Sequence, residues 1–152
     1  MDIQIRRAAP EEAGALSQIA LVAKRHWGYP ERWMELWKPE LTFDRAYFEQ
    51  NESWVAANGG QQVGFYTLQE KDGHAWLDNL FIKPEYMGQG IGKTLFNHAI
   101  EVSRQHGHIL LRWESDPNAT GFYEKLGARK IGERRSEVDG QSRRLPIMEI
   151  NL

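Results

Sequence analysis

The sequence of 152 residues has no cysteine, no long apolar run and no stretch rich in lysine and arginine. Without cysteine, the chain can form no disulfide bond, no thiolate metal site and no cysteine nucleophile. The formal net charge of −2 gives no electrostatic footprint for nucleic acid. No apolar stretch approaches membrane-spanning length, and the first residues lack a basic segment followed by an apolar one. We therefore expect a cytoplasmic protein that binds neither nucleic acid nor a membrane.

Two further features are missing. The five histidines show no spacing typical of a metal site, so no metal cofactor is predicted. The sequence also has no internal repeat, low-complexity tract or linker, and its length suits one hydrophobic core. We expect a single domain over residues 1–152.

Apolar periodicity and turn residues predict alternating strands and helices. Two hairpin turns, Asn58-Gly59-Gly60 and Lys71-Asp72-Gly73, join three antiparallel strands. A polar loop is expected inside a terminal hairpin. The expected strands are 1–7, 53–57, 62–68, 74–82, 109–113, 128–135 and 145–151. The expected helices are about 10–23, 31–37, 44–50, 93–105 and 116–126. This order predicts a mixed α/β sheet with helices on both faces.

The segment from Asp78 to Lys93 reads as a strand, a glycine-rich turn and the start of a helix. Its apolar run ends at Pro84, which cannot continue a ladder, and Gly88, Gly90 and Gly92 follow. Glycine lets backbone N–H groups turn inward, and a helix N-terminus adds partial positive charge at the same point. The segment therefore predicts a cradle for anions such as phosphates.

The spacing of this loop excludes two common nucleotide motifs. A triphosphatase P-loop needs glycine five residues before Gly92-Lys93-Thr94, where this chain has Met87. A dinucleotide fingerprint needs glycine at position 93 or 95, and these positions hold Lys93 and Leu95.

The loop instead resembles the acetyl-coenzyme A (acetyl-CoA) loop of the GCN5-related N-acetyltransferase (GNAT) superfamily, Arg/Gln-x-x-Gly-x-Gly/Ala. Gln89-Gly90-Ile91-Gly92 fits the second half, whereas Met87 stands where the family usually has Arg or Gln. A second segment, Asp116 to Ala128, is similar to the family's late helix, Asn-x-x-Ala-x-x-Phe-Tyr-x-x-x-Gly-Phe. Asp116 takes the usual Asn place and Ala128 the usual Phe place.

More narrowly, three segments resemble a set of small bacterial members of this superfamily. They are Lys24-x-x-Trp27-Gly28-Tyr29, Asp116-Pro117-Asn118-Ala119 and Arg144-Leu145-Pro146.

The resemblance implies a mostly antiparallel sheet whose strands splay at the cofactor site. It also implies that an acetyl group moves from acetyl-CoA to a primary amine of a small molecule or peptide, by direct attack on the thioester. The cofactor-binding residues it implies are Leu80, Phe81, Ile82, Met87, Gly88, Gln89, Gly90, Ile91, Gly92, Lys93, Asp116, Asn118, Phe122 and Tyr123.

Three chemical tasks follow from that reaction. The oxyanion needs a donor, which this family takes from a backbone N–H before the loop, here about Phe81 or Ile82. The departing thiolate needs an acid, which in this family is often the tyrosine of the late helix, here Tyr123. A phenol suits this task because its ordinary pKa of about 10 keeps it protonated at neutral pH. The competing interpretation of Tyr123 is a packed aromatic residue.

The third task is a base that takes the proton of the amine. Asp78 is the best candidate, because a carboxylate is unexpected in the middle of a strand, where it shares a face with Trp76, Leu80 and Ile82. A strand aspartate that faces solvent or pairs with an arginine is the simpler alternative. Glu114, just past the fifth strand, is a rival base.

Aromatic residues near position 30 are candidates for contact with the acceptor. Trp27 and Tyr29 lie in an irregular turn, where cation–π attraction would suit a protonated amine. Trp33 and Trp37 are one helical turn apart and are expected to be core residues.

Two other functions stay open. Met87 in the phosphate loop is compatible with a regulatory module that binds acyl-CoA without turnover. A protein lysine acetyltransferase is the second, and an acidic groove, which the sequence does not display, would favour it. The exposed edges of the terminal hairpin are compatible with a homodimer.

Overall fold

The computed structural model describes residues 1–152. Its strands are β1 (Ile3–Arg7), β2 (Glu52–Asn58), β3 (Gln61–Lys71), β4 (His74–Ile82), β5 (Leu110–Glu114), β6 (Arg129–Val138) and β7 (Gln141–Asn151). Its α-helices are α1 (Ala13–Arg25), α2 (Glu31–Trp37), α3 (Arg45–Gln50), α4 (Ile91–Gln105) and α5 (Thr120–Lys125). Three short 3-10 turns, Pro10–Glu12, Pro84–Tyr86 and Pro117–Ala119, precede α1, α4 and α5.

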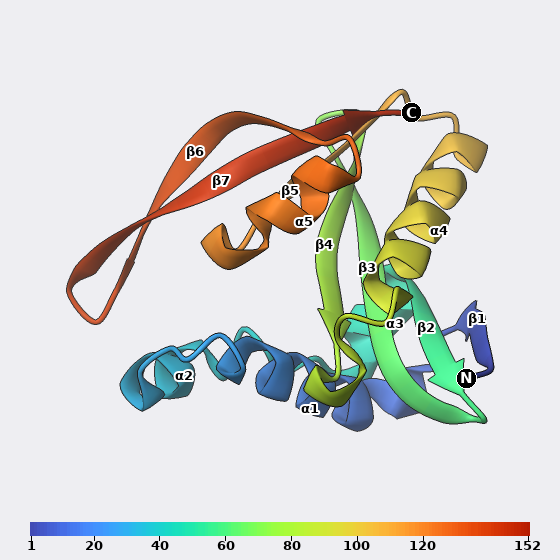
Figure 1. Ribbon diagram of the computed structural model, residues 1–152, viewed down its shortest axis with the longest axis horizontal. Helices are drawn as coiled ribbons and strands as arrows, with labels where there is room; N and C mark the ends of the chain where they lie inside the picture. Colours follow the sequence, from blue (N-terminus) through green and yellow to red (C-terminus); the bar gives the residue numbers. More distant parts are fainter.

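All seven strands form one sheet in the order β1-β2-β3-β4-β5-β7-β6 (Figure 1). Neighbouring strands are antiparallel except β4 and β5, which are parallel. The chain passes from β4 to β5 through α4, as a parallel pair requires. The predicted α/β fold with a mixed, mostly antiparallel sheet is confirmed.

Helices cover both faces of the sheet, and each face has its own hydrophobic core. The larger core lies under α4 and α5 and includes Tyr66, Leu77, Leu95, Phe96, Trp113 and Tyr123. The second lies under α1, α2 and α3 and includes Leu16, Ile19, Met34, Phe48, Val55 and Phe65. Each core is formed from the helical and strand periodicities that the sequence displays.

The terminal hairpin differs from its prediction. Residues 136–144, expected as a polar loop, belong to two long strands that meet at a two-residue turn. Asp139 and Gly140 have φ values of 51° and 75°, the left-handed conformation that such turns need. The ladder continues through polar pairs such as Ser136 with Arg143, so backbone pairing maintains strands that lack an apolar pattern. The result is an arm that extends away from the sheet toward α2 (Figure 1).

A β-bulge interrupts β4 at Asp78. Thr67 of β3 pairs with Asn79, and Leu68 pairs with Leu77, which leaves Asp78 without a partner. The extra residue shifts the alternation by one, so Leu77 and Leu80 both pack on the α4 side. Asp78 therefore does not continue one uninterrupted face from Trp76 to Ile82, as the simple alternation predicts.

The parallel strands β4 and β5 pair only at their beginnings. Ala75 pairs with Leu111 and Trp76 with Arg112, and no pairing follows. From Leu77 onward the two strands diverge and open a gap in the sheet. This is the splay that the family resemblance implies.

No helix has the length and apolar character that crossing a membrane requires. No three histidine, aspartate or glutamate side chains are arranged so that they could hold a metal ion.

Candidate active site

A cavity of about 440 Å³ lies where β4 and β5 diverge. Its walls come from the end of α1, from β4, from the glycine loop that opens α4, from the end of β5 and from the start of α5. The polypeptide thus brings together the glycine loop, which ends at Gly92, and the motif that begins at Asp116.

Most predicted site residues line this cavity. They are Trp27, Asp78, Leu80, Phe81, Ile82, Met87, Gly88, Gly90, Gly92, Lys93, Asp116, Asn118, Phe122 and Tyr123. Three do not line it. Gln89 turns its side-chain amide to the Glu85 carbonyl at 3.1 Å, Ile91 is buried in the larger core, and Tyr29 lies among the α2 aromatics.

The glycine loop has the conformation that its sequence requires. Gly88 and Gly90 have φ values of 77° and 87°, where other residues are strained. Gly90 is also the N-cap of α4, and its carbonyl accepts the Thr94 N–H at 3.0 Å. The backbone N–H groups before Thr94 have no acceptor within the helix, and no acidic side chain occupies the first turn. They form a concentrated group of donors for an anion.

The edge of β4 supplies a second set of backbone groups. The Lys83 N–H donates to the Val63 carbonyl at 2.8 Å, so the backbone groups of Lys83 point toward β3. In an antiparallel ladder the direction of the backbone N–H and C=O groups alternates along the strand, so those of Phe81 also point toward β3. Leu80 and Ile82 therefore turn their N–H and C=O groups toward the gap. Of the two residues suggested for the oxyanion donor, Ile82 has the required direction and Phe81 does not.

Tyr123 of α5 lies in the wall of the cavity. It is 7% exposed and packs against Trp113 and Phe96, with ring centroids 4.8 and 5.4 Å away. Its hydroxyl makes no hydrogen bond within the chain. Burial, aided by the charge of Asp116, raises the pKa of Tyr123, so the phenol keeps its proton at neutral pH.

Asp116 is the centre of a polar network. Its carboxylate accepts from Lys24 Nζ at 2.7 Å, from the Tyr29 hydroxyl at 2.8 Å and from the Asn118 backbone N–H at 2.9 Å. Burial alone would raise the pKa of this carboxyl, but Lys24 and the hydrogen bonds outweigh it and hold the pKa below its ordinary value. Burial and Asp116 raise the pKa of Tyr29 to about 12. Arg143 also donates to the Tyr29 hydroxyl, at 2.9 Å.

The hydrogen-bonding capacity of the Tyr29 hydroxyl is therefore used within the protein. Its ring packs against Trp33 and Trp37, and the guanidinium of Arg143 lies 5.0 Å from the Tyr29 centroid and 4.9 Å from that of Trp37. Trp33 and Trp37 are only partly buried, and both rings contact Arg143 of the β6–β7 arm. Trp37 also packs against the second hydrophobic core, as expected.

A second cavity, of about 600 Å³, adjoins the first and is strongly acidic. The two cavities share Lys24, Asp78, Glu114 and Asp116. Six carboxylates line the second cavity against three cations. The carboxylates are Glu40, Asp78, Glu114, Asp116, Glu137 and Asp139, and the cations are Lys24, Arg134 and Arg143.

Both candidate bases lie at this junction, with different surroundings. Glu114 forms an ion pair with Arg134, with its carboxylate 2.8 Å from Nε. Asp78 has no cationic partner and is solvent-exposed, and its Oδ2 accepts from the Tyr47 hydroxyl. Glu114 is therefore held by an ion pair that a cationic acceptor would have to displace, and Asp78 is not.

The sequence did not identify the acidic cavity, because its residues come from separate segments. Glu40 precedes α3, Glu114 ends β5, and Glu137 and Asp139 lie at the tip of the arm. No local motif marks them. Only the position of the arm brings Glu137 and Asp139 into the cavity that Asp78 lines.

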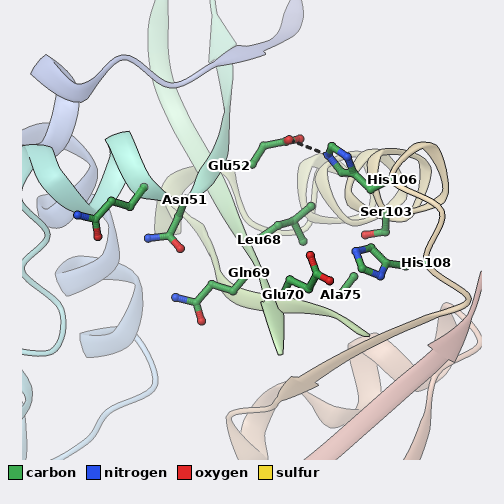
Figure 2. A pocket seen from close by; sticks show the side chains of 10 residues that line it. Asn51, Glu52, Leu68, Gln69, Glu70, Ala75, Ser103, His106 and His108 are labelled. Carbon is green, nitrogen blue, oxygen red and sulfur yellow. Dashed lines mark hydrogen bonds and ion pairs between the residues drawn. The ribbon is translucent and has the colours of Figure 1, made fainter. Parts of the chain in front are cut away.

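The structure has another cavity, of about 660 Å³, beside the C-terminal end of α4 (Figure 2). It shares no residue with the two cavities above. Its Glu52 side chain is paired with His106 at 2.8 Å. Burial alone would raise the pKa of the Glu52 carboxyl, but hydrogen bonds from Trp54 and His106 hold it below its ordinary value.

Comparison with known proteins agrees with this geometry. The sequence model of the acetyltransferase (GNAT) family matches residues 19–128. The peptidyl-lysine N-acetyltransferase YjaB of Escherichia coli is 33% identical over 107 residues, which cover 70% of this chain and 67% of that protein.

Two solved structures have the same fold. A GCN5-related N-acetyltransferase from Rhodopseudomonas palustris superposes with a TM-score of 0.85 at 23% identity, covering 100% of this chain and 97% of the other. The PaiA N-acetyltransferase from Thermoplasma acidophilum, solved with coenzyme A, has a TM-score of 0.79 at 24% identity and full coverage of both chains.

Proposed function

This chain belongs to the acetyltransferase (GNAT) family and is an acetyl-CoA-dependent N-acetyltransferase, and from that premise we propose that its acceptor is a lysine side chain in a positively charged peptide. The observation that carries the proposal is the junction of two cavities at Asp78. One cavity has the glycine loop, the β4 edge and Tyr123, and the other is acidic. A reaction between an anionic cofactor and a cationic acceptor needs a site that binds anions and, next to it, a site that binds cations.

The residues present fit acetyl-CoA. The N-terminus of α4 provides backbone donors for phosphate groups, and the loop needs no polar side chain at Met87 for these contacts. The unpaired edge of β4 at Leu80 and Ile82 suits the amide groups of an extended arm. Trp113 also lines the cavity, and its buried indole Nε1 has no hydrogen-bond partner. When bound, acetyl-CoA supplies an activated thioester.

Each chemical task then has a candidate in the chain. Asp78 accepts the proton of the incoming amine at the junction of the cavities. The N–H groups of Leu80 and Ile82 point into the gap, where they can stabilise negative charge on an oxygen. Tyr123, kept protonated by burial, donates its proton to the departing sulfur.

The charge of the acidic cavity supports a cationic acceptor. Glu40 and Glu137 have no cationic partner, whereas Glu114 and Asp116 are paired with Arg134 and Lys24. The free carboxylates attract positive charge around the reactive amine and exclude acidic acceptors. The similarity to a peptidyl-lysine N-acetyltransferase supports the same acceptor class.

The test compares two lysine peptides that differ only in their neighbours, arginine or glutamate on each side of the lysine. Release of the coenzyme A thiol and the mass of the product are measured with acetyl-CoA in excess. We expect faster acetylation of the arginine-flanked peptide, and an advantage that shrinks as salt increases. The double variant Glu40→Gln with Glu137→Gln should raise KM for that peptide about fivefold.

A matched control is Glu49→Gln with Glu101→Gln, which removes the same charge from α3 and α4 outside both cavities. It should leave KM unchanged. Equal rates for the two peptides would refute the cationic acceptor, and no thiol release with either peptide would refute lysine as the acceptor.

A further inference from the structure

Asp78 owes its position to the bulge in β4. Because it has no partner on β3, its side chain is free of the ladder's alternation. It lines the cavity between β4 and β5, which we call the cofactor cavity, as well as the acidic cavity and a third cavity of about 410 Å³. A bulged residue on a strand edge has few neighbours to fix its orientation, so another element must hold the carboxylate.

Tyr47 of α3 makes that contact. Its hydroxyl donates to Asp78 Oδ2, accepts from Asn79 Nδ2 at 2.9 Å and lies 2.9 Å from Thr67 Oγ1. The phenol has one proton, and Asn79 fills its acceptor side, so the proton is directed to Asp78. Asn79 also donates to Thr67 at 3.0 Å, which closes the cluster.

The position of Tyr47 is itself fixed. The Asp44 side chain caps α3 by accepting the Tyr47 backbone N–H at 2.9 Å. The ring packs against Phe43 and Phe48, with centroids 4.8 and 5.3 Å away. Burial, together with the hydrogen bond to Asp78, raises the pKa of Tyr47, so the phenol remains a donor throughout the neutral range.

The polar contacts of Asp78 fall on one oxygen. Tyr47 donates to Oδ2, Asn79 Nδ2 lies 3.2 Å from the same oxygen, and Oδ1 accepts no hydrogen bond within the chain. One oxygen is therefore anchored while the other is free to receive a proton. This asymmetry is what a base needs if it must be both oriented and reactive.

We propose that Tyr47 is the positioning residue that aims Asp78 Oδ1 at the acceptor amine, an inference that rests on the proposed function. In the step concerned, an N–H bond of the ammonium breaks and its electron pair stays on nitrogen. The proton forms an O–H bond with Asp78 Oδ1 and is later released to water. Tyr47 keeps its own proton throughout.

Other charged groups share the surroundings of Asp78 and set the background of any pH profile. They are Lys24 of α1, Glu40 and Asp44 before α3, Lys93 of α4, Glu114 of β5, Asp116 before α5, and Arg134, Glu137, Asp139 and Arg143 of the arm. None of them is changed when the Tyr47 hydroxyl is removed, so a difference between variant and wild type reports on the hydrogen bond itself.

The test is Tyr47→Phe, which keeps the ring and removes the donor. With the arginine-flanked lysine peptide, we expect kcat/KM to fall about tenfold at neutral pH, the effect of losing one hydrogen bond to a charged group. The profile of kcat/KM against pH should differ from that of wild type, because the Asp78 carboxylate loses a hydrogen-bond donor. Affinity for coenzyme A, measured by calorimetry, should stay within twofold of wild type.

Two further variants separate the possible failures. Tyr66→Phe removes a phenol hydroxyl that contacts His98 at 2.6 Å in the larger core, and should leave the pH profile unchanged. Asp78→Asn should reduce kcat/KM by at least a hundredfold. If Asp78→Asn stays active, Asp78 is not the base and the proposed mechanism is wrong. If it is inactive but Tyr47→Phe matches wild type in rate and pH profile, the positioning role alone is refuted.

Discussion

At the scale of single residues, Tyr123 combines burial with a hydroxyl that no protein group occupies. Neighbouring tyrosines differ, because the Tyr29 and Tyr47 hydroxyls are both bound to carboxylates. A phenol with a raised pKa and no internal acceptor is suited to giving its proton to an atom of the ligand.

We therefore expect Tyr123→Phe to lower kcat about a hundredfold, because the departing sulfur loses its proton donor. Affinity for coenzyme A should change less than threefold, since the ring and its packing remain. Thiol release measures the first quantity and calorimetric titration the second. Tyr66→Phe is again the matched control, and a Tyr123→Phe enzyme with wild-type kcat would mean that water supplies the proton.

Asp116 shows how a departure from a family motif is accommodated. The resemblance has Asn at this place, and a carboxylate there adds a negative charge beside the cofactor cavity. Lys24 neutralises it at 2.7 Å, and the Lys24 Nζ also lies 4.7 Å from the Trp37 ring centroid. Lys24 and Tyr29 belong to one of the segments shared with the small bacterial members, so these residues and Asp116 act together.

At the scale of elements, the first turn of α4 depends on the absence of a side chain at Gly92. A Cβ built there would lie 3.2 Å from Phe122 Cζ and 3.9 Å from Ile82 Cγ1, both in the wall of the cofactor cavity. Gly14 in α1 offers a comparison, because a Cβ there meets nothing within 4 Å. Neither glycine has a positive φ, so alanine causes no backbone strain at either site.

Gly92→Ala should therefore separate binding from stability. We expect affinity for coenzyme A to fall about tenfold, because the methyl group displaces Phe122 into the cavity. Gly14→Ala should leave affinity unchanged and raise the free energy of unfolding by about 0.5–1 kcal/mol. Calorimetry and urea unfolding measure the two quantities. Equal affinity in both variants would show that the first turn of α4 does not hold the cofactor.

The elements that the sequence predicted well are those with a local signal. The glycines from Gly88 to Gly92 and the hairpin turns set their own backbone conformation, so the loop and β4 were found at nearly their true bounds. The outer part of the β6–β7 arm was missed, because polar strands held by a ladder have no apolar alternation to detect. The bulge at Asp78 was missed because one extra residue is visible only in the pairing with β3.

The sequence likewise predicts one part of the candidate site and not the other. The cofactor cavity was predicted almost completely, since two contiguous motifs supply most of its wall. The acidic cavity was not, because its carboxylates come from segments that are far apart in the sequence. Tyr29 was placed near the acceptor from its turn, but only the structure reveals that Asp116 and Arg143 already hold its hydroxyl.

At the scale of the whole molecule, one sheet separates two hydrophobic cores, and strands such as β3 contribute to both. Neither core is closed without the sheet. We therefore propose that residues 1–152 fold as a single domain with one cooperative transition. Contacts that tie the N-terminal segment to the sheet then contribute to the stability of the entire chain.

Glu12 makes several of these contacts. Its carboxylate accepts from Arg6 at 2.6 and 2.9 Å, from the Ala9 backbone N–H at 2.8 Å and from Gln62 of β3 at 2.8 Å. Hydrogen bonds from Arg6 are the main cause that lowers the pKa of Glu12 to about 2. A carboxyl whose pKa is lower in the folded than in the unfolded state stabilises the fold above its unfolded pKa. That stability is lost as the pH falls from about 4.5 to about 2.

Glu12→Gln should accordingly lower the free energy of unfolding by about 1–2 kcal/mol at pH 7, a value reduced for solvent screening at the partly exposed Arg6. The difference from wild type should shrink through the range between pH 4.5 and 2, because wild-type Glu12 becomes protonated there. Urea unfolding at a series of pH values measures both effects. Glu101→Gln, which removes an exposed pair with Arg104 on α4, should change stability by less than about 0.5 kcal/mol at every pH. A Glu12→Gln difference that stayed constant from pH 7 to pH 2 would mean that packing of this side chain, and not its charge, connects the N-terminal segment to the sheet.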